Sequence, residues 1–148
     1  MNIHADRHVS SELPINERHI GLRRLYLGLA LFFIADIVVQ VFLAGTGIFV
    51  SGEYLVWHGY HSWLLDTVAF LLLVVGLLGR LPRSLNWLTA LLFVLVFIQA
   101  ALIHASSDFH VPLLSAFHPV FALCIFVLPF FLRAQVRRLV KAEVRIAQ

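Results

Sequence analysis

The sequence predicts an all-α integral membrane protein, an antiparallel bundle of four helices with both termini in the cytoplasm. Of its 148 residues, 61% are hydrophobic and only 13% are charged, whereas about 25% of residues are charged in a typical soluble domain. The apolar residues fall into four runs close to the roughly 20 residues that cross a bilayer. None of the 11 lysines and arginines lies in residues 45–62 or 104–112, two of the segments that separate these runs.

The four runs are expected to form helices because they are too long for strands and do not alternate in polarity. A helix also satisfies all its backbone hydrogen bonds within lipid. The predicted spans cover about residues 25–43, 57–78, 85–103 and 113–132. Gly45, Gly47 and Gly52 are expected to break the chain after the first span. The segments "GRLPRS" and "SSDFHVP" supply the other two connections.

The basic residues set the predicted orientation. They precede the first span, lie between the second and third, and follow the fourth, and such segments stay in the cytoplasm. The expected organisation is therefore a polar tail (1–21), a transmembrane domain (22–133) and a basic tail (134–148), without a cleavable signal peptide. We expect a multi-pass protein of the bacterial inner membrane. The sequence pI of about 9.6 then reflects topology and contact with anionic lipids rather than nucleic-acid binding.

Histidines and acidic residues gather in the predicted outer half. Five of the eight histidines lie there, namely His58, His61, His104, His110 and His118, while the other three belong to the N-terminal tail and are expected to be solvated. Ionisable groups within a membrane usually face the bundle interior, and each is a candidate functional residue.

Helical spacing groups the polar residues of the first two spans. Asp36 and Gln40 are four residues apart and share one helix face. In the second span, a polar face covering about 140° contains His58, His61, Ser62 and Asp66. An alternative role for Gln99 and Asp66 is ordinary hydrogen bonding between helices.

His61 and His118 are the predicted pair of cofactor ligands. Both lie near the start of a helix on the same side of the membrane, and Pro119 is compatible with the first turn. Two neutral imidazoles on facing helices suit the axial positions of haem iron. His58 is the alternate ligand. Candidates for contact with the haem propionates are His104, Ser106, Ser107 and Tyr60.

Other functions remain open from the residues alone. His58 and His61, with Asp66 or His110, are possible ligands for zinc or copper. The outer cluster could also handle protons through Asp66, or the chain could be a haem-free accessory subunit. No pattern for nucleophilic catalysis stands out, and Cys124 is expected to be buried and inert. The chain is therefore expected to be an electron carrier or a subunit rather than a stand-alone enzyme.

The order of these segments resembles one four-helix half of heme A synthase. The matching segments are "VFLAGTGIFVSG" (41–52), "YHSWLLDTVAFLLLVVG" (60–76), "FIQAALIHA" (97–105) and "FHPVFAL" (117–123). The chain is also similar to an uncharacterised bacterial family of small four-helix membrane proteins with the same order of His, Gln and His-Pro. The resemblance covers roughly residues 25–132.

The resemblance implies haem binding by His61 and His118, with Gln99 nearby, and it selects His61 over His58. Ser62 stands where the synthase family has an Arg, and Glu53 lies eight residues before His61, further than the acid of the family pattern. The implied activity is therefore haem b binding for electron transfer, without oxidation of a haem methyl group. Quinone or other subunits of a redox complex are the expected partners, and a homodimer would restore an eight-helix form.

Overall fold

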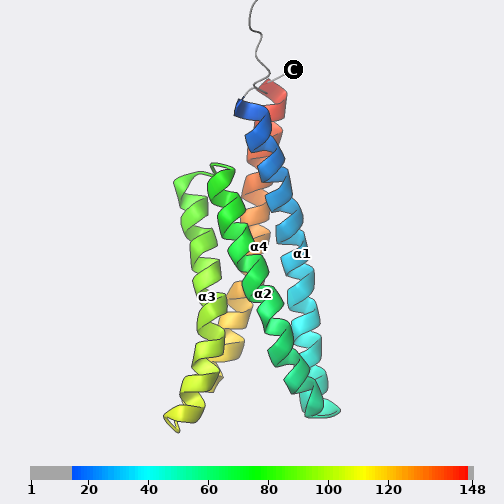
Figure 1. The fold of residues 1–148 in the computed structure, drawn as a ribbon, viewed down its shortest axis with the longest axis vertical. Coiled ribbons are helices and arrows are strands. Elements are labelled where there is room, and N and C mark those ends of the chain that lie inside the picture. The colour runs from blue at the N-terminus through cyan, green and yellow to red at the C-terminus, as the bar shows by residue number, and fades with distance from the viewer. Residues whose placement is uncertain (1–14, 147–148) are drawn as a thin grey trace, which may run out of the picture.

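The computed structural model describes residues 15–146, and these fold almost entirely into four helices (Figure 1). They are α1 (Ile15–Phe49), α2 (Glu53–Leu78), α3 (Arg83–Asp108) and α4 (Leu113–Ile146). Each is long and apolar enough to cross a membrane. The predicted all-α architecture of four membrane-length helices is thereby confirmed. His4 and His8 of the expected N-terminal tail lie outside the described residues.

The helices extend beyond the predicted spans. α1 continues through Gly45 and Gly47, so the expectation that these glycines break the chain was wrong, and the turn comes only at residues 50–52. A glycine inside a helix costs about 0.5–1 kcal/mol, which the rest of a long helix offsets. At the other end of the chain, the expected basic tail continues α4 as far as Ile146. Nine of the 13 residues 134–146 are Ala, Arg, Gln, Leu, Lys or Glu, which are good helix formers.

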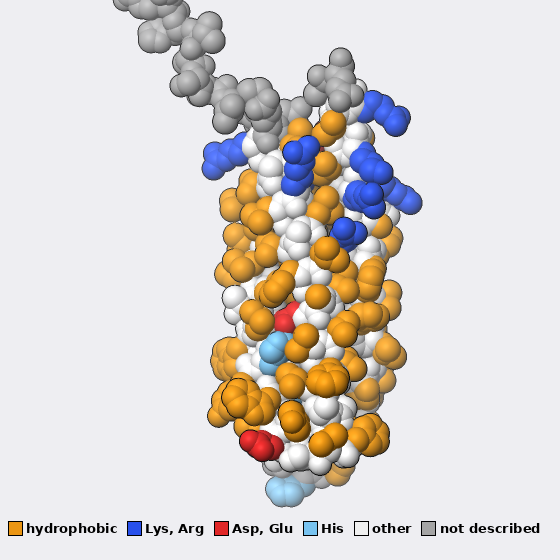
Figure 2. Space-filling model, turned by 90° about the vertical axis from the view of Figure 1, so that its right-hand side faces the viewer, with side chains coloured by type: hydrophobic (Ala, Val, Ile, Leu, Met, Phe, Trp, Pro, Cys, Tyr) orange, Lys and Arg blue, Asp and Glu red, His pale blue; other side chains and the backbone are white. Residues whose placement is uncertain are grey.

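The four helices enclose a common centre. α1 and α3 each pack against both α2 and α4, so that α2 and α4 face one another diagonally. Both described chain ends and the α2–α3 turn lie at one end of the molecule, and the other two turns lie at the opposite end (Figure 1). We name the first the basic end, since the described lysines and arginines gather there (Figure 2). The second is named the histidine end.

The apolar core occupies the basic end and the middle of the bundle. Tyr26, Phe33, Leu72, Leu92 and Leu132 are completely or almost completely buried in it. Toward the histidine end, the last buried core side chains on the four helices are Ile37, Leu65, Val96 and Ile125. Toward the histidine end the α1–α2 pair diverges from the α3–α4 pair (Figure 1).

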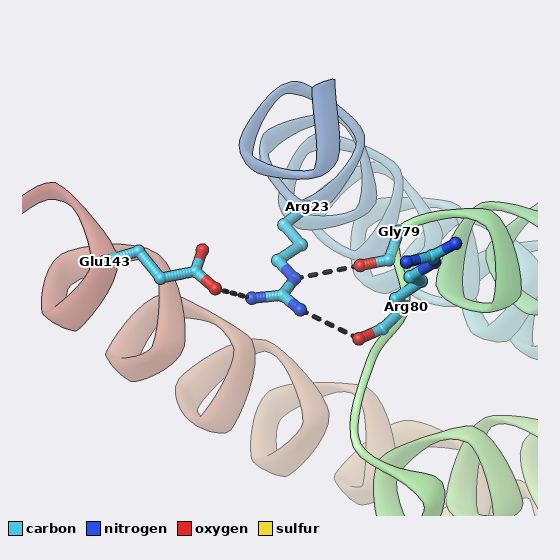
Figure 3. A network of polar contacts seen from close by, with 4 residues as sticks. All are labelled: Arg23, Gly79, Arg80 and Glu143. Carbon is cyan, nitrogen blue, oxygen red and sulfur yellow. Dashed lines mark hydrogen bonds and ion pairs between the residues drawn. The ribbon is translucent and has the colours of Figure 1, made fainter. Parts of the chain in front are cut away.

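Arg23 of α1 forms polar contacts with the end of α2 and with α4 at the basic end (Figure 3). Its Nε donates to the carbonyl of Gly79 at 2.9 Å, and its Nη2 donates to the carbonyl of Arg80 at 2.8 Å. Its Nη1 forms an ion pair with Glu143 of α4. One guanidinium thus satisfies carbonyls at the end of α2 and holds α4 against α1. The sequence had indicated only a role for Arg23 in orientation.

Two expectations about small residues are corrected. Cys124 is exposed on α4 and not buried, so in the bilayer it faces lipid. The sequence also offers seven small residues that would let a flat cofactor approach, on the first, third and fourth spans. Of these, Ala30 is buried in the core and Ala122 is half-buried, whereas the other five are exposed, namely Gly28, Ala35, Ala100, Ala101 and Ala116. Their distribution results from the rotation of each helix about its axis, which composition does not determine.

Candidate functional site

A polar cluster lies directly beyond the last core side chains, toward the histidine end. Its members come from all four helices and are Asp36, Gln40, His58, His61, Gln99 and His118. Asp36 and Gln40 are among the few buried polar side chains, at 5% and 8% exposure. Burying such groups in an apolar environment is costly unless each has a partner, and most of these partners lie within the cluster.

His61 is held by two groups of α1. Its Nε2 lies 3.1 Å from Asp36 Oδ1, and its Nδ1 lies 3.0 Å from Gln40 Oε1. Both partners are acceptors, so the ring donates to Gln40 while one proton is shared between Nε2 and the Asp36 carboxyl. Both nitrogens of His61 are therefore engaged. Among the described residues, the second carboxyl oxygen of Asp36 has no hydrogen-bond partner.

Gln40 also fixes His58. Its Nε2 donates to the His58 carbonyl at 2.9 Å, and its own carbonyl lies 3.0 Å from His58 Nδ1. Because a carbonyl oxygen only accepts, His58 must carry a proton on Nδ1. The neutral His58 ring then has its lone pair on Nε2.

His118 faces His58 from the diagonal helix. The centres of the two rings are 6.1 Å apart, with their planes at 64°. Both rings reach into the space between α2 and α4, two helices that do not pack directly on each other in the described chain. This is the place where helix bundles build cofactor and metal sites.

Gln99 of α3 supports His118. With its amide nitrogen placed toward the ring, Gln99 donates to His118 Nδ1 at 2.6 Å and to the His118 carbonyl at 3.0 Å, and its oxygen accepts from the Ala122 N–H at 3.1 Å. An unprotonated Nδ1 places the proton of a neutral His118 ring on Nε2. The cluster therefore presents a lone pair on His58 and an N–H on His118.

The structure brings the alternate ligand of the sequence prediction, His58, close to His118. His118 lies beside His58 rather than His61, because His61 turns toward α1 and is bound by Asp36 and Gln40. Gln99 lies where the resemblance implied, next to His118. Gln40 and Asp36 had been placed on one helix face, but they had not been assigned to the site. Their four-residue spacing was the available signal.

Several predicted site residues lie outside the cluster. Asp66 is half-buried and forms neither a hydrogen bond nor an ion pair with any described side chain. His104, Ser107 and Tyr60 are exposed, and Ser106 instead bonds Val111 and Ser115 around the α3–α4 turn. The mixed zinc or copper site is not assembled, since no three His, Cys, Asp or Glu residues of the described chain meet in a metal-binding group.

A cavity of about 540 Å³ opens beside the cluster at the histidine end. It is lined by Leu43, Tyr54, Trp57, Tyr60 and His61. Three of these five side chains are aromatic, and His61 connects the cavity to Asp36 and Gln40. The size falls within the range of about 300–1,000 Å³ typical of small-molecule sites.

Fold and site together define a multi-pass four-helix membrane protein with a buried histidine, glutamine and aspartate cluster near one end of its spans. Residues 40–107 are similar to a family described as "Family of unknown function (DUF6220)". This match fits the resemblance to an uncharacterised family, whereas nothing in the comparisons links the chain to heme A synthase. Neither a curated protein nor a solved structure matches the chain.

Proposed function

We propose that this protein binds b-type haem within the membrane, with His58 and His118 as the axial ligands, and serves in electron transfer. The observation that carries the proposal is the 6.1 Å separation of the two rings across the bundle. Two imidazoles brought this close from facing helices could both ligate one haem iron. Bound haem would supply a one-electron iron couple.

The residues around His58 fit this role, and those around His118 fit it after one change of tautomer. Metal-bound histidines usually donate their second N–H to a carbonyl or carboxylate, which fixes the ring and its tautomer. His58 makes this bond to the Gln40 carbonyl and keeps its Nε2 lone pair for the metal. Coordination through His118 Nε2 requires its proton to move to Nδ1, and the Gln99 amide nitrogen then has to turn away from that ring nitrogen. The buried side chains Val96 and Ile125 exclude water on the core side.

The proposal includes a location and partners. With the basic end in the cytoplasm, as the positive-inside rule requires, the four helices run antiparallel and the histidine end faces outward in a bacterial inner membrane. A lipid-soluble quinone suits the cavity beside His61, because its aromatic lining can stack on a flat ring. A larger redox complex or a second copy of the chain are further candidate partners.

An absorption spectrum of the purified protein, reduced minus oxidised, tests the proposal. Expressed with haem supplied, the protein should show Soret and α-bands, and both should be lost in His58→Ala and in His118→Ala. His61→Ala should retain them, in contrast to the pairing expected from sequence. His110→Asn is the control, since His110 is exposed and has a positive φ of 56°, which Asn tolerates.

The absorption spectrum can also give the opposite result. Protein without these bands would contradict the proposal and favour a haem-free subunit of a larger complex. A misfolded variant is recognised by its elution in gel filtration. His58→Met provides a further check, because a thioether can replace an imidazole as an axial ligand and raises the reduction potential.

A second candidate function, a proton-binding site, is favoured by the Asp36 and His61 pair. Asp36 is almost fully buried, and its Oδ1 lies 3.1 Å from His61 Nε2. Intramembrane Asp–His pairs of this kind occur in proton relays. Infrared spectra across a pH range should show one carboxyl band that is absent in Asp36→Asn and unchanged in Asp66→Asn. Identical spectra for the wild type and Asp36→Asn would rule this function out.

A further inference from the structure

A second cavity lies at the basic end, far along α4 from the histidine cluster. It has a volume of about 360 Å³ and is bounded by α1 and α4. Two kinds of side chain line it. Leu31, Ile34 and Phe130 form an apolar wall, and four cationic side chains form the rest together with Ala134, namely Arg133, Arg137, Arg138 and Lys141.

The cations form one stripe on α4. Arg133, Arg137 and Lys141 follow at intervals of four residues, so they project from the same helix face over about 12 Å. None of the four forms an ion pair with a described side chain, and Glu143, the acidic residue nearest in sequence, is engaged with Arg23. Arg133 Nε is shielded from solvent and has no hydrogen-bond partner in the described part of the chain. Positive charge concentrated in this way attracts an anion.

The apolar wall identifies what kind of anion fits. Leu31 and Phe130 are about half exposed, at 53% and 48%, and lie on the side of the cavity toward the middle of the spans. The apolar run of α4 ends at Leu132, directly before the first cation. The cavity therefore crosses the boundary between the hydrocarbon and the headgroups, and Figure 2 shows the same transition from orange to blue surface. A molecule with an anionic head and an apolar tail matches both parts.

We propose that this cavity is a binding site for an anionic phospholipid, whose phosphate lies among Arg133, Arg137 and Lys141 and whose acyl chain lies against Leu31 and Phe130. Guanidinium groups bind phosphate oxygens through paired hydrogen bonds. Basic pockets between membrane helices bind lipid headgroups by this chemistry. A free phosphate ion would use the same cations, but would leave the apolar wall unused.

The test is lipid binding to the full chain in neutral detergent. Mixed micelles containing phosphatidylglycerol or phosphatidylcholine are titrated against the protein, and binding is followed by native mass spectrometry. We expect phosphatidylglycerol to bind and phosphatidylcholine to bind at least ten times more weakly. The double variant Arg133→Gln/Arg137→Gln should weaken phosphatidylglycerol binding about thirty-fold, given the contribution of each basic residue near a lipid surface.

A matched control separates this site from general surface charge. Arg18→Gln/Arg24→Gln removes the same charge from exposed positions at the same end, outside the cavity lining. It should change binding by less than threefold. Equal weakening by the two double variants would overturn the site, as would equal binding of the two lipids.

Two further arms distinguish the lipid from a free ion. Inorganic phosphate at millimolar concentration should not displace phosphatidylglycerol, and Leu31→Ala/Phe130→Ala should weaken lipid binding while the cations remain. Displacement by phosphate, or no effect of the apolar variant, would overturn the assignment to a lipid. Arg133→Lys keeps the charge and the fold but loses the paired hydrogen bonds, so it should give an intermediate affinity.

Discussion

At the scale of single residues, Gln40 holds the candidate site together. Its amide nitrogen, amide oxygen and backbone carbonyl each meet a different group of α2, and these groups belong to His58 and His61. Because the side-chain amide of Gln40 is planar, the direction of its N–H donor fixes the direction of its oxygen acceptor. Because the nitrogen must donate to the His58 carbonyl, the oxygen must face His61, which then has to donate from Nδ1. Gln40, which lies one turn from Asp36 on α1, thus determines that His61 carries a proton on Nδ1.

Replacing Gln40 by leucine should therefore destabilise the protein. Two side-chain hydrogen bonds are lost, and the His58 carbonyl and His61 Nδ1 are left without them. We expect the free energy of unfolding, measured by steric trapping in bicelles, to fall by about 1–3 kcal/mol. Thr67→Val is the control, because the exposed Thr67 hydroxyl bonds only the Trp63 carbonyl of its own helix. Equal losses in the two variants would contradict the linking role of Gln40.

Part of this site could be predicted from the sequence. Helical spacing placed Asp36 and Gln40 on one face, and it did the same for His58 and His61. The pattern could not show which histidine meets α4. The two positions differ by about 4.5 Å along α2 and 60° around it, so the rotation of α2 about its own axis decides which of them faces α4. That rotation depends on how the side chains of α1 and α2 pack, which a single sequence does not encode in its periodicity.

At the scale of the helices, number, order and type were predictable, but the helix ends were not. Length and polarity identified four spans, since few other structures are possible in lipid. Gly45 and Gly47 misled the prediction because glycine permits a turn without requiring one. In the structure Gly47 instead allows α1 to pack closely against Leu55 of α2. A β-carbon there would lie 2.6 Å from Leu55 Cγ and Cδ2 and 3.0 Å from the Leu55 backbone nitrogen.

The approach of α1 to α2 near their connection therefore depends on Gly47. Gly47→Ala should lower the free energy of unfolding by about 1–3 kcal/mol, because the added methyl group overlaps Leu55. Gly28→Ala is the matched control. Gly28 also lies within α1, but a β-carbon there meets no described atom within 4 Å. The control should raise stability by about 0.5–1 kcal/mol. The same sign for both variants in an unfolding titration would argue against close packing at Gly47.

At the scale of the whole molecule, the two ends have different chemistry. At the basic end, Arg23 links the helices and buried apolar side chains fill the core, whereas the helix pairs diverge toward the histidine end, where the polar cluster lies. A cofactor site and a lipid site can therefore occupy one small bundle without sharing a residue. The side of the membrane that each end faces then determines which partner molecules can reach it.

The distribution of lysine and arginine predicts the basic end in the cytoplasm. Ser51 lies in the α1–α2 turn, and Ser84 lies in the first turn of α3 beside the α2–α3 connection. Both are exposed, and each can be replaced by cysteine after Cys124→Ala removes the native thiol. In intact spheroplasts, a membrane-impermeant maleimide should label the Ser51→Cys variant and leave the Ser84→Cys variant unlabelled until the membrane is opened. The reverse pattern would place the histidine cluster on the cytoplasmic side, and proposed electron partners would then have to be sought there. Because labelling of intact and opened membranes uses the same two variants, each turn serves as the control for the other.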